Sequence, residues 1–405
     1  MQIRNPAAIL RTNKRVQQLP LPAQMKIAVN TRFLLHDYLE GYGYFLYETF
    51  RRIVKNHPEH EFLFIFDRPF DKKFIAGLAV KTIITGPPAR HPLLWKLWYD
   101  VKIPAVLRKY KADVFVSTDG FCSLRTKVPQ CLVIHDLAFL HFPAFISRTQ
   151  LLFYKRYTPE FLKKAKSVAT VSDFSKRDIL TQYKTDPRKI IVVNSAAKEI
   201  FRPLNNDEKQ GIKNKYTDGK EYLVYAGAIH PRKNLLQLLK AFSVFKKRQQ
   251  TNMKLVLAGR LAWKYEAFVE NLKNYKYRKD VLLTGYLEEE ELANLVGAAY
   301  MLVYPSLWEG FGVPVLEAMR CDVPVITSAG SAMQEIAKDA ALYIDPANYH
   351  DIAEKIMVVY KDEQLKKEMI RKGREVTAGY SWDKTAELLW LSIVAAFPAV
   401  KEAVQ

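Results

Sequence analysis

Residues 304–319 have the sequence Tyr-Pro-Ser-Leu-Trp-Glu-Gly-Phe-Gly-Val-Pro-Val-Leu-Glu-Ala-Met. The apolar run before them ends at Tyr304 and predicts a strand, residues 307–312 predict a loop, and Val313 begins a helical pattern. Pro314 suits the first turn of that helix, where a missing N–H removes no hydrogen bond. The segment therefore predicts a strand, a glycine loop and a helix, which is the repeating unit of an α/β protein.

The glycine loop predicts a place where backbone and ligand come close. Gly310 and Gly312 leave room for such an approach. The free amides and positive dipole end of the following helix can hold a diphosphate. Glu309 and Glu317 can then accept hydrogen bonds from sugar hydroxyls. In the structural alternative, the glycines only make a tight turn and Glu317 complements the helix dipole.

The same alternation of short apolar runs and amphipathic stretches continues along the chain from Lys26. It predicts parallel strands covered by helices on both faces. The predicted strands are 26–30, 62–66, 114–117, 130–135, 167–171, 190–193, 222–226, 253–258, 281–284, 300–304, 323–327 and 341–344. The clearest helical patterns in the first half are 43–56, 93–109, 149–165 and 175–183. The predicted fold class is α/β with two parallel sheets.

A break in composition separates two halves of similar size. Residues 201–220 are polar and rich in lysine, which predicts an interdomain connection. We expect a loosely ordered leader over 1–24, with no signal-peptide pattern. One domain is then expected over 25–200, a second over 221–380 and a final segment over 381–400. A cleft between the two domains is the expected site.

The 405-residue chain has a formal net charge of +20, and 49% of its residues are hydrophobic. Its length allows more than one core. Its charge would attract polyanions, phosphorylated substrates or anionic lipid headgroups without choosing among them. No window approaches the roughly 18 apolar residues of a membrane span, so we expect a cytoplasmic protein. Cys122, Cys131 and Cys321 form no CxxC pair, and we interpret them as structural.

Several motifs occur together in a fixed order along the chain. They are Gly41-Tyr42-Gly43, His135-Asp136-Leu137, residues 170–175 (Thr-Val-Ser-Asp-Phe-Ser), Pro231-Arg232-Lys233-Asn234, and Pro305-Ser306 ahead of Glu309. With the paired glutamates, this set resembles the retaining glycosyltransferases of family 4. The resemblance runs from about residue 26 to 392. It implies the GT-B fold, in which two Rossmann-like, doubly wound parallel-sheet domains face a central cleft.

The resemblance assigns roles to the paired glutamates. In these enzymes the later glutamate binds the ribose hydroxyls of the nucleotide, and the earlier one reaches the hydroxyls of the donor sugar. These roles fall on Glu317 and Glu309. The loop amides around Gly310, Phe311 and Gly312 would complete the contact with sugar and diphosphate.

Arg232 and Lys233 follow the strand 222–226 and resemble the basic pair that stabilises the departing nucleotide diphosphate. Taken alone, a basic pair at the start of a helix is more often exposed to solvent. We find no Asp-x-Asp element and no His or Cys cluster at metal-ligand spacing. We therefore predict metal-independent activity and no cofactor.

Three further segments are predicted to line the site. His135 ends an apolar strand and resembles the family histidine that contacts the donor sugar, the alternative being a plain strand-terminal histidine. Gly41 and Gly43 precede a helix expected from Tyr44, where their backbone could approach the phosphate or the acceptor, or simply make a flexible turn. Gly285-Tyr286 matches the segment beside the base.

Two residues are secondary candidates for the site. Asp136 could be a sugar-binding acceptor, a helix cap or a structural partner of His135. Ser172 belongs to the motif at 170–175 and could cap the predicted helix over 175–183.

The sequence departs from the family pattern at three places. Ala228 stands where an arginine is common, so one diphosphate contact is missing, and Arg232 could take over that role. Residues 194–196 lack the usual glycine, and Asp322 stands where a glycine commonly precedes the next strand. The final segment from Ser381 resembles the helix that crosses back to the first domain in these enzymes.

The resemblance implies transfer of a sugar from a GDP- or UDP-sugar to the hydroxyl of a saccharide or lipid-linked acceptor, with retention of configuration. It leans toward mannosyltransferases and cell-surface polysaccharide or glycolipid synthesis. The positive charge also suggests peripheral contact with an anionic inner membrane face.

Two other classes of enzyme remain as alternatives, namely a glycogen-synthase-like polymerase and a nucleotide-sugar epimerase. A more distant alternative is a polyanion-binding protein, which leaves the motif from Glu309 to Glu317 unexplained. We expect no nucleic-acid partner.

Overall fold

A computed structural model describes residues 22–34, 39 and 41–397. The chain divides into two compact units. The first consists of Met1–Asn194 together with Trp382–Gln405, and the second of Ser195–Ser381. The chain therefore passes from one unit to the other twice.

The first unit contains a seven-stranded sheet of order β3-β2-β1-β4-β5-β6-β7, in which all neighbouring strands are parallel. Its strands are β1 (Lys26–Asn30), β2 (Glu61–Phe66), β3 (Val80–Ile84), β4 (Val114–Ser117), β5 (Gln130–Ile134), β6 (Ser167–Thr170) and β7 (Ile190–Val192). The strand order reverses between β1 and β4. Their carboxyl ends flank the switch point at which sheets of this kind bind ligands.

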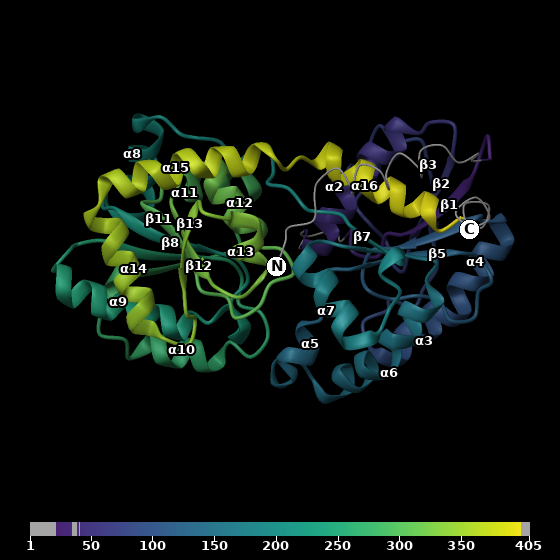
Figure 1. Ribbon diagram of the computed structural model, residues 1–405, viewed down its shortest axis with the longest axis horizontal. Helices are drawn as coiled ribbons and strands as arrows, with labels where there is room; N and C mark the ends of the chain where they lie inside the picture. Colours follow the sequence, from purple (N-terminus) through teal and green to yellow (C-terminus); the bar gives the residue numbers. More distant parts are fainter. Residues whose placement is uncertain (1–21, 35–38, 40, 398–405) are drawn as a thin grey trace. The chain divides into compact units, whose positions relative to one another are not determined.

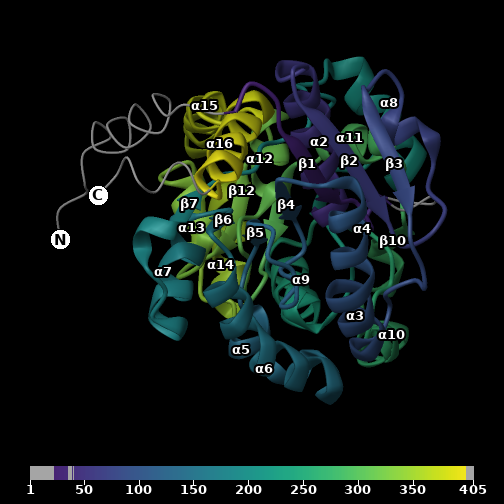
Figure 2. The same ribbon diagram turned by 90° about the vertical axis from the view of Figure 1, so that its right-hand side faces the viewer.

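Helices cover both faces of this sheet (Figure 1, Figure 2). One face carries α2 (Gly41–Asn56) and α16 (Trp382–Ala395). The other carries α3 (Pro92–Leu97), the π-helical turn η2 (Trp98–Lys102), α4 (Ile103–Tyr110), α6 (Arg148–Lys164) and α7 (Asp173–Tyr183). Short helices lie in the loops, namely η1 (Lys72–Ile75), α5 (Ala138–His141), η3 (Pro143–Phe145) and η4 (Pro187–Lys189). Ser167 Oγ on β6 donates to the carbonyl of Ser392 on α16 at 2.6 Å.

The second unit contains a six-stranded parallel sheet of order β10-β9-β8-β11-β12-β13, so its switch point lies between β8 and β11. Its strands are β8 (Tyr222–Ala226), β9 (Lys254–Ala258), β10 (Val281–Gly285), β11 (Met301–Tyr304), β12 (Val325–Ser328) and β13 (Ala341–Ile344). Its helices are α8 (Asn206–Thr217), η5 (Pro231–Lys233), α9 (Leu235–Gln249), α10 (Glu266–Lys273), η6 (Arg278–Asp280), α11 (Glu289–Gly297), α12 (Val313–Arg320), α13 (Ala332–Ala337), α14 (Tyr349–Lys361) and α15 (Glu363–Ala378).

The predicted α/β class and the two parallel sheets are confirmed. The edge strand β3 was not predicted. None of its residues is fully buried, so the continuous apolar run that marks a central parallel strand is missing. The helix predicted over 93–109 is three consecutive pieces, α3, η2 and α4. Pro104 has no N–H to donate to the carbonyl four residues earlier, and the helix widens into the π turn just before it.

The polar segment 201–220, expected as the interdomain connection, contains helix α8 and lies within the second unit, which begins at Ser195. Asn205 caps α8 by accepting from the amide of Glu208, and the Glu208 carboxylate accepts from the amide of Asn205 at 2.8 Å. This capping box satisfies two amides at the start of the helix. The polar composition thus belongs to a capped helix with few buried residues.

The three cysteines are buried free thiols. Burial raises the pKa of Cys122, Cys131 and Cys321, the last to about 12. All three therefore stay protonated at neutral pH, as expected of small packing residues.

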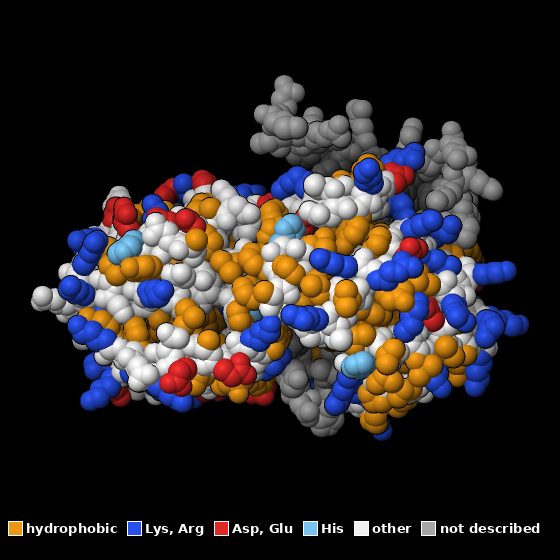
Figure 3. All heavy atoms as spheres, turned by 90° about the horizontal axis from the view of Figure 1, so that it is seen from below, with side chains coloured by type: hydrophobic (Ala, Val, Ile, Leu, Met, Phe, Trp, Pro, Cys, Tyr) orange, Lys and Arg blue, Asp and Glu red, His pale blue; other side chains and the backbone are white. Residues whose placement is uncertain are grey.

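The first unit exposes apolar side chains on the face formed by α3, η2 and α6. Leu93, Leu97, Val101 and Leu152 are exposed there, Leu93 by 75% and Leu152 by 68%. We call these four residues the α3–α6 face. Figure 3 looks toward it and shows hydrophobic side chains among Lys and Arg. Exposed basic residues on α6 are Arg148, Lys155, Arg156 and Lys163. None of the described helices is long and apolar enough to cross a lipid bilayer.

Candidate functional site

The switch point of the second sheet brings Arg232, Lys233 and Glu309 together. The first two lie in η5, which follows β8, and Glu309 lies in the loop that follows β11. The two loops meet because β8 and β11 are neighbours in the sheet. The amide of Leu307 donates to the carbonyl of Arg232 at 2.9 Å, and Nη1 of Arg232 donates to the carbonyl of Trp308.

Glu309 is buried, with 9% of its surface exposed. Its Oε1 accepts hydrogen bonds from Nζ of Lys233, from Oγ of Ser306 at 2.5 Å and from the hydroxyl of Tyr304 at 3.2 Å. Its Oε2 lies 3.3 Å from Nη1 of Arg232. Three residues predicted from distant parts of the sequence therefore form one buried cluster.

This cluster sets the charge of Glu309. Burial opposes ionisation, but the charges of Arg232 and Lys233 and the hydrogen bonds outweigh it and hold the pKa of Glu309 at about 2. At neutral pH the group is a carboxylate, which accepts hydrogen bonds and has no proton to donate. This charge state suits a group that accepts hydrogen bonds from hydroxyls.

Gly312 makes the turn into α12. It has φ +103°, and a Cβ at this position would lie 2.7 Å from Cγ of Met333. Pro314 occupies the first turn of α12, as predicted. Gly310 and Phe311 are buried, and the ring of Phe311 packs edge-on against Tyr380 with centroids 5.8 Å apart. The Phe311 side chain therefore stabilises the loop, and its backbone is the part left for a ligand.

Glu317 lies on α12 and is 6% exposed. Burial raises its pKa to about 7; Lys198 acts in the opposite direction and Glu289 in the same direction. Lys198 and Glu289 form their own ion pair at 3.3 Å. The two glutamates of the motif thus have opposite pKa shifts, because only Glu309 has two cations beside it.

Gly285 ends β10 with φ +72°, and Tyr286 is 46% exposed. Gly285 belongs to a row of positive-φ glycines at the carboxyl ends of β8, β9 and β10, the others being Gly227 and Gly259. The amide of Gly259 donates to the carbonyl of Gly285 at 2.9 Å. A Cβ on Gly259 would clash with the carbonyl of Gly227. Gly259 was not predicted from the sequence, since a lone glycine after a strand is a weak signal.

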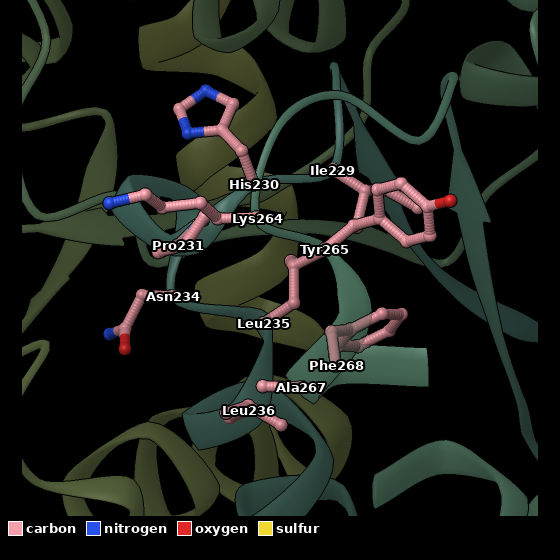
Figure 4. A pocket seen from close by; sticks show the side chains of 10 residues that line it. All are labelled: Ile229, His230, Pro231, Asn234, Leu235, Leu236, Lys264, Tyr265, Ala267 and Phe268. Carbon is pink, nitrogen blue, oxygen red and sulfur yellow. The ribbon is translucent and has the colours of Figure 1, made fainter. Parts of the chain in front are cut away.

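A cavity of about 160 Å³ lies between η5, the start of α9 and residues 264–268 (Figure 4). His230 borders it and stacks on Trp263, with ring centroids 4.4 Å apart. Burial and the charges of Lys233 and Arg232 lower the pKa of His230 to about 3, so its ring is neutral. Ligand sites usually measure about 300–1,000 Å³, so this cavity is too small for a whole nucleotide sugar.

His135 follows β5 at the carboxyl edge of the first sheet. Its Nε2 donates to the carbonyl of Thr118 at 2.9 Å. Burial lowers its pKa, so the neutral ring carries its proton on Nε2 and leaves Nδ1 as an acceptor. Tyr42 and Phe45 of α2 pack on the ring, with centroids 4.5 and 5.1 Å away. Ser175 Oγ donates to the His135 carbonyl at 3.0 Å.

Gly41 and Gly43 lie in the first turn of α2, so the helix predicted over 43–56 begins two residues earlier, and the two glycines do not precede it as a loop. A Cβ on Gly43 would clash with the carbonyl of Phe33. The close approach that Gly43 permits is thus to the protein's own backbone. Tyr42 between the glycines contacts His135, so the structure does bring these two predicted segments together.

The two secondary candidates are both found at helix starts. Oδ1 of Asp136 accepts from the amide of Ala138 at 2.9 Å, at the beginning of α5. The N-cap position of α5 is Leu137 and has no side-chain cap, so this bond is a local turn beside the helix, and the role of Asp136 at the site stays a prediction. Ser172 is the N-cap of α7, and its Oγ accepts from the amide of Ser175 at 3.0 Å.

A buried network at the switch point of the first sheet was not predicted from the sequence. Asp119 accepts hydrogen bonds from Nε of Arg32 at 2.5 Å, from Nδ2 of Asn30 at 2.9 Å and from the hydroxyl of Tyr99 at 2.7 Å. Oγ of Ser117 donates to the same carboxylate at 3.0 Å. Burial by itself would lower the pKa of Arg32, but the adjacent Asp119 carboxylate raises that pKa above its usual range. The next residue toward the N-terminus, Thr118, provides the carbonyl that binds His135.

The prediction that the chain has no His cluster at metal-ligand spacing was wrong. His57, Glu59 and His60 follow one another in the turn between α2 and β2, and one ligand atom from each lies within 4.8 Å of the others. The turn of the backbone brings these three side chains together.

The structure also shows how Asp322 replaces a glycine. Asp322 has φ +60°, a conformation in which Asp is more readily accommodated than most other non-glycine residues. Its carboxylate binds the guanidinium of Arg374 with two bonds of 2.7 and 2.5 Å. This bidentate pair holds the turn before β12.

Two family models match the chain. The model described as Glycosyltransferase Family 4 matches residues 41–196, and the model described as Glycosyl transferases group 1 matches residues 206–376. The first match includes His135, and the second includes Arg232, Lys233, Glu309 and Glu317.

Individual proteins are similar over most of the chain. O-antigen chain mannosyltransferase B of Escherichia coli is 27% identical over 298 residues, 73% of this chain and 78% of that protein. O-antigen chain mannosyltransferase RfbU of Salmonella typhimurium is 27% identical over 334 residues, 80% of this chain and 87% of that protein. The solved structure of Anabaena HepE with UDP-glucose superposes with a TM-score of 0.69 at 15% identity, covering 90% of this chain and 97% of that one, which shows the fold. The chain belongs to the group 1 glycosyltransferases, with the GT-B fold.

Proposed function

We propose that this glycosyltransferase moves a hexose from a nucleotide diphosphate sugar to an acceptor hydroxyl with retention of configuration and without a divalent cation. The observation that carries the proposal is the buried cluster of Glu309, Arg232 and Lys233 at the switch point of the second sheet. GDP-mannose is the first donor to test, because the similar Escherichia coli and Salmonella proteins are named mannosyltransferases. UDP-sugars follow, because HepE was solved with UDP-glucose.

The charges in the cluster fit a departing diphosphate. Arg232 and Lys233 place two cations beside one carboxylate, so the cluster keeps a net positive charge that favours the developing negative charge. The N-terminus of α12 adds free amides. These groups supply the charge stabilisation that a divalent cation supplies in other enzymes.

The proposed reaction breaks the bond between the anomeric carbon and the diphosphate oxygen. The acceptor oxygen forms the new bond on the same face, and its proton passes to a diphosphate oxygen. Glu309 binds the donor-sugar hydroxyls and Glu317 the ribose. In the first unit, Nδ1 of His135 is the acceptor atom that the ring offers to a sugar hydroxyl.

The acceptor is proposed to be a saccharide or lipid-linked saccharide in cell-surface polysaccharide or glycolipid synthesis. The named roles of the similar proteins in O-antigen chains support this class. The proposed location is cytoplasmic, with the α3–α6 face resting on the anionic inner membrane surface. Exposed Leu93 and Leu152 beside basic residues of α6 support that contact.

The test is a transfer assay on the purified chain with a panel of GDP- and UDP-sugars and defined saccharide acceptors, with and without EDTA. The expected result is one preferred donor, a product of retained anomeric configuration by NMR, and a rate unchanged by EDTA. Glu309→Gln and Lys233→Met should nearly abolish transfer, and Glu354→Gln and Lys361→Met, on the exposed side of α14, are matched controls. An epimerised donor or an inverted product would contradict the proposal.

A further inference from the structure

The turn at residues 57–60, His-Pro-Glu-His, places three ligand-type side chains at the end of α2. Nδ1 of His57 lies 3.5 Å from Oε1 of Glu59, and Nε2 of His60 lies 3.4 Å from the same oxygen. One nitrogen of each ring thus points to one place beside Glu59.

These distances are long for hydrogen bonds, which are usually about 2.9 Å between nitrogen and oxygen. They match a shared metal ion better. With bonds of about 2.0–2.1 Å, the ligands of a tetrahedral zinc ion lie about 3.3 Å apart. The three ligand atoms, all within 4.8 Å of one another, need only a small convergence to reach that geometry.

Trp390 of α16 forms the floor of the cluster. The ring of His57 stacks on it with centroids 3.8 Å apart, and the ring of His60 lies parallel at 5.2 Å. The planes of the two imidazoles are nearly parallel, at 8°. The indole therefore fixes both rings with their edges turned toward Glu59.

The side chains differ in how far they are buried. That of His60 is 4% exposed, that of His57 25% and that of Glu59 50%. Within the described residues, Nδ1 of His60 has no hydrogen-bond partner. An ion bound to Nε2 of His60 would thus sit at the edge of the protein and keep an open coordination position toward solvent.

We propose that His57, Glu59 and His60 bind a divalent transition-metal ion of the zinc class. Two imidazoles and one carboxylate form a ligand set that suits Zn²⁺ and leaves a fourth position for water. The bound ion would tie the turn between α2 and β2 to the surface of Trp390, and so fasten α16 to the first unit.

This site is separate from the proposed chemistry. Glu61 begins β2, so the turn lies at the amino edge of the first sheet. His135 and the Asp119 network lie at the carboxyl edge. Metal binding here should therefore change stability and leave the initial rate of transfer unchanged.

The test uses untagged, chelator-treated protein titrated with Zn²⁺ by calorimetry and with Co²⁺ by absorption and fluorescence. We expect one Zn²⁺ per chain, a higher melting temperature with Zn²⁺, and quenching of tryptophan fluorescence by Co²⁺. His57→Gln and Glu59→Gln should each weaken Zn²⁺ binding by about tenfold or more, by comparison with the 10- to 100-fold effect of outer-shell ligands. His350→Gln and Glu354→Gln, both at exposed positions, are the matched controls.

Trp390→Phe should keep the Zn²⁺ affinity within a few-fold and lose most of the Co²⁺ quenching, which locates the ion over this indole. Circular dichroism of the metal-free variants checks that each is folded. The proposal is overturned if the wild-type chain shows no saturable Zn²⁺ binding. It is equally overturned if folded His57→Gln and Glu59→Gln bind Zn²⁺ like the wild type, or if Trp390→Phe keeps the full quenching.

Discussion

Oε2 of Glu309 lies 3.3 Å from Nη1 of Arg232, while Oε1 of the same carboxylate accepts a hydrogen bond from Lys233. One anion thus holds two cations at the end of β8 before any substrate is bound. The arrangement orients Arg232 and Lys233 in advance, which lowers the cost of reorganisation when negative charge develops on a leaving group. It also makes the activity and the stability of the second unit depend on the same carboxylate.

Replacing Glu309 should therefore affect both properties. Glu309→Gln is expected to lower kcat/KM by about 10²–10³-fold, the size of effect seen when one transition-state contact is removed. In the wild type, the lowered pKa of Glu309 contributes to the free energy of unfolding. This contribution is fully present above about pH 4.5 and is lost as the pH falls toward about 2. Denaturant unfolding across this range should show an acid-sensitive term, on the order of 3 kcal/mol, that Glu309→Gln lacks. If the variant loses as much stability at low pH as the wild type, the carboxylate is not held by these cations.

Glu317 should behave in the opposite way. Its raised pKa means that the folded chain binds this proton more tightly than the unfolded chain, so stability falls as the pH rises from about 4.5 to about 7. Glu317→Gln should remove that fall and be the more stable chain at pH 8. Nucleotide binding through the ribose should strengthen as the carboxylate ionises, so calorimetry in buffers of different ionisation enthalpy should detect proton release near pH 7. No proton release would count against ribose binding by Glu317.

Gly312→Ala tests the turn into α12. The positive φ of +103° and the 2.7 Å approach of Met333 both oppose a Cβ. The variant should lose about 1–3 kcal/mol of stability together with donor binding. Gly211→Ala is the matched control, because Gly211 lies within α8 and its Cβ would meet nothing within 4 Å. The control should leave the free energy of unfolding unchanged or raise it by about 0.5–1 kcal/mol. Equal losses of stability in both variants would show that Gly312 is not required by backbone strain.

Asp119→Leu should leave the buried guanidinium of Arg32 without the carboxylate that it hydrogen-bonds. The expected loss is about 3–5 kcal/mol of stability, the usual result of breaking one side of a buried ion pair. The double variant Arg32→Met with Asp119→Leu should recover most of that loss, because no buried charge is left unpaired. Urea unfolding of the two single variants and the double variant measures the coupling. Additive losses would mean that the pair is not energetically coupled.

The membrane contact is tested by Leu93→Ser combined with Leu152→Ser. Sedimentation with vesicles containing anionic phosphatidylglycerol should show weaker binding by about tenfold or more, since two exposed leucines no longer insert. Binding of the wild type should also fall with salt and be weak on neutral vesicles. Leu236→Ser with Leu261→Ser, which are exposed by 37% and 41% in the second unit, is the control. Equal binding of both double variants would locate the contact elsewhere.

The elements of the fold could largely be predicted from the sequence because central parallel strands are continuous apolar runs. Strands such as β4 and β8 have fully buried residues throughout, and they appear where the sequence predicted them. β3 lacks that signal because it lies at an exposed edge. The helix predicted over 43–56 lacked the first two residues of α2 because Gly41 and Gly43 resemble a loop, and the close approach of the Phe33 carbonyl explains the glycine at position 43 of the helix.

For the candidate site, the sequence indicated the residues but not their partners. Lys233 and Glu309 are 76 residues apart, and Arg32 and Asp119 are 87 residues apart. Each pair meets because two strands that are distant in the chain are neighbours at a switch point. Arg32, in particular, has no local pattern that marks it as half of a buried ion pair. The His57 cluster was missed because its spacing corresponds to no standard ligand motif, and it depends on a turn that only the structure shows.

The return of the chain through α16 has a consequence for synthesis on the ribosome. The residues of the second unit emerge after β7 and before α16. Synthesis proceeds at about 5–20 residues per second, so α16 emerges on the order of tens of seconds after the strands of the first unit. During that interval the apolar surface that α16 covers, around Ser167 and Cys131, is open to water and to chaperones. The sheet of the first unit is thus made before the second unit and covered by α16 only after it.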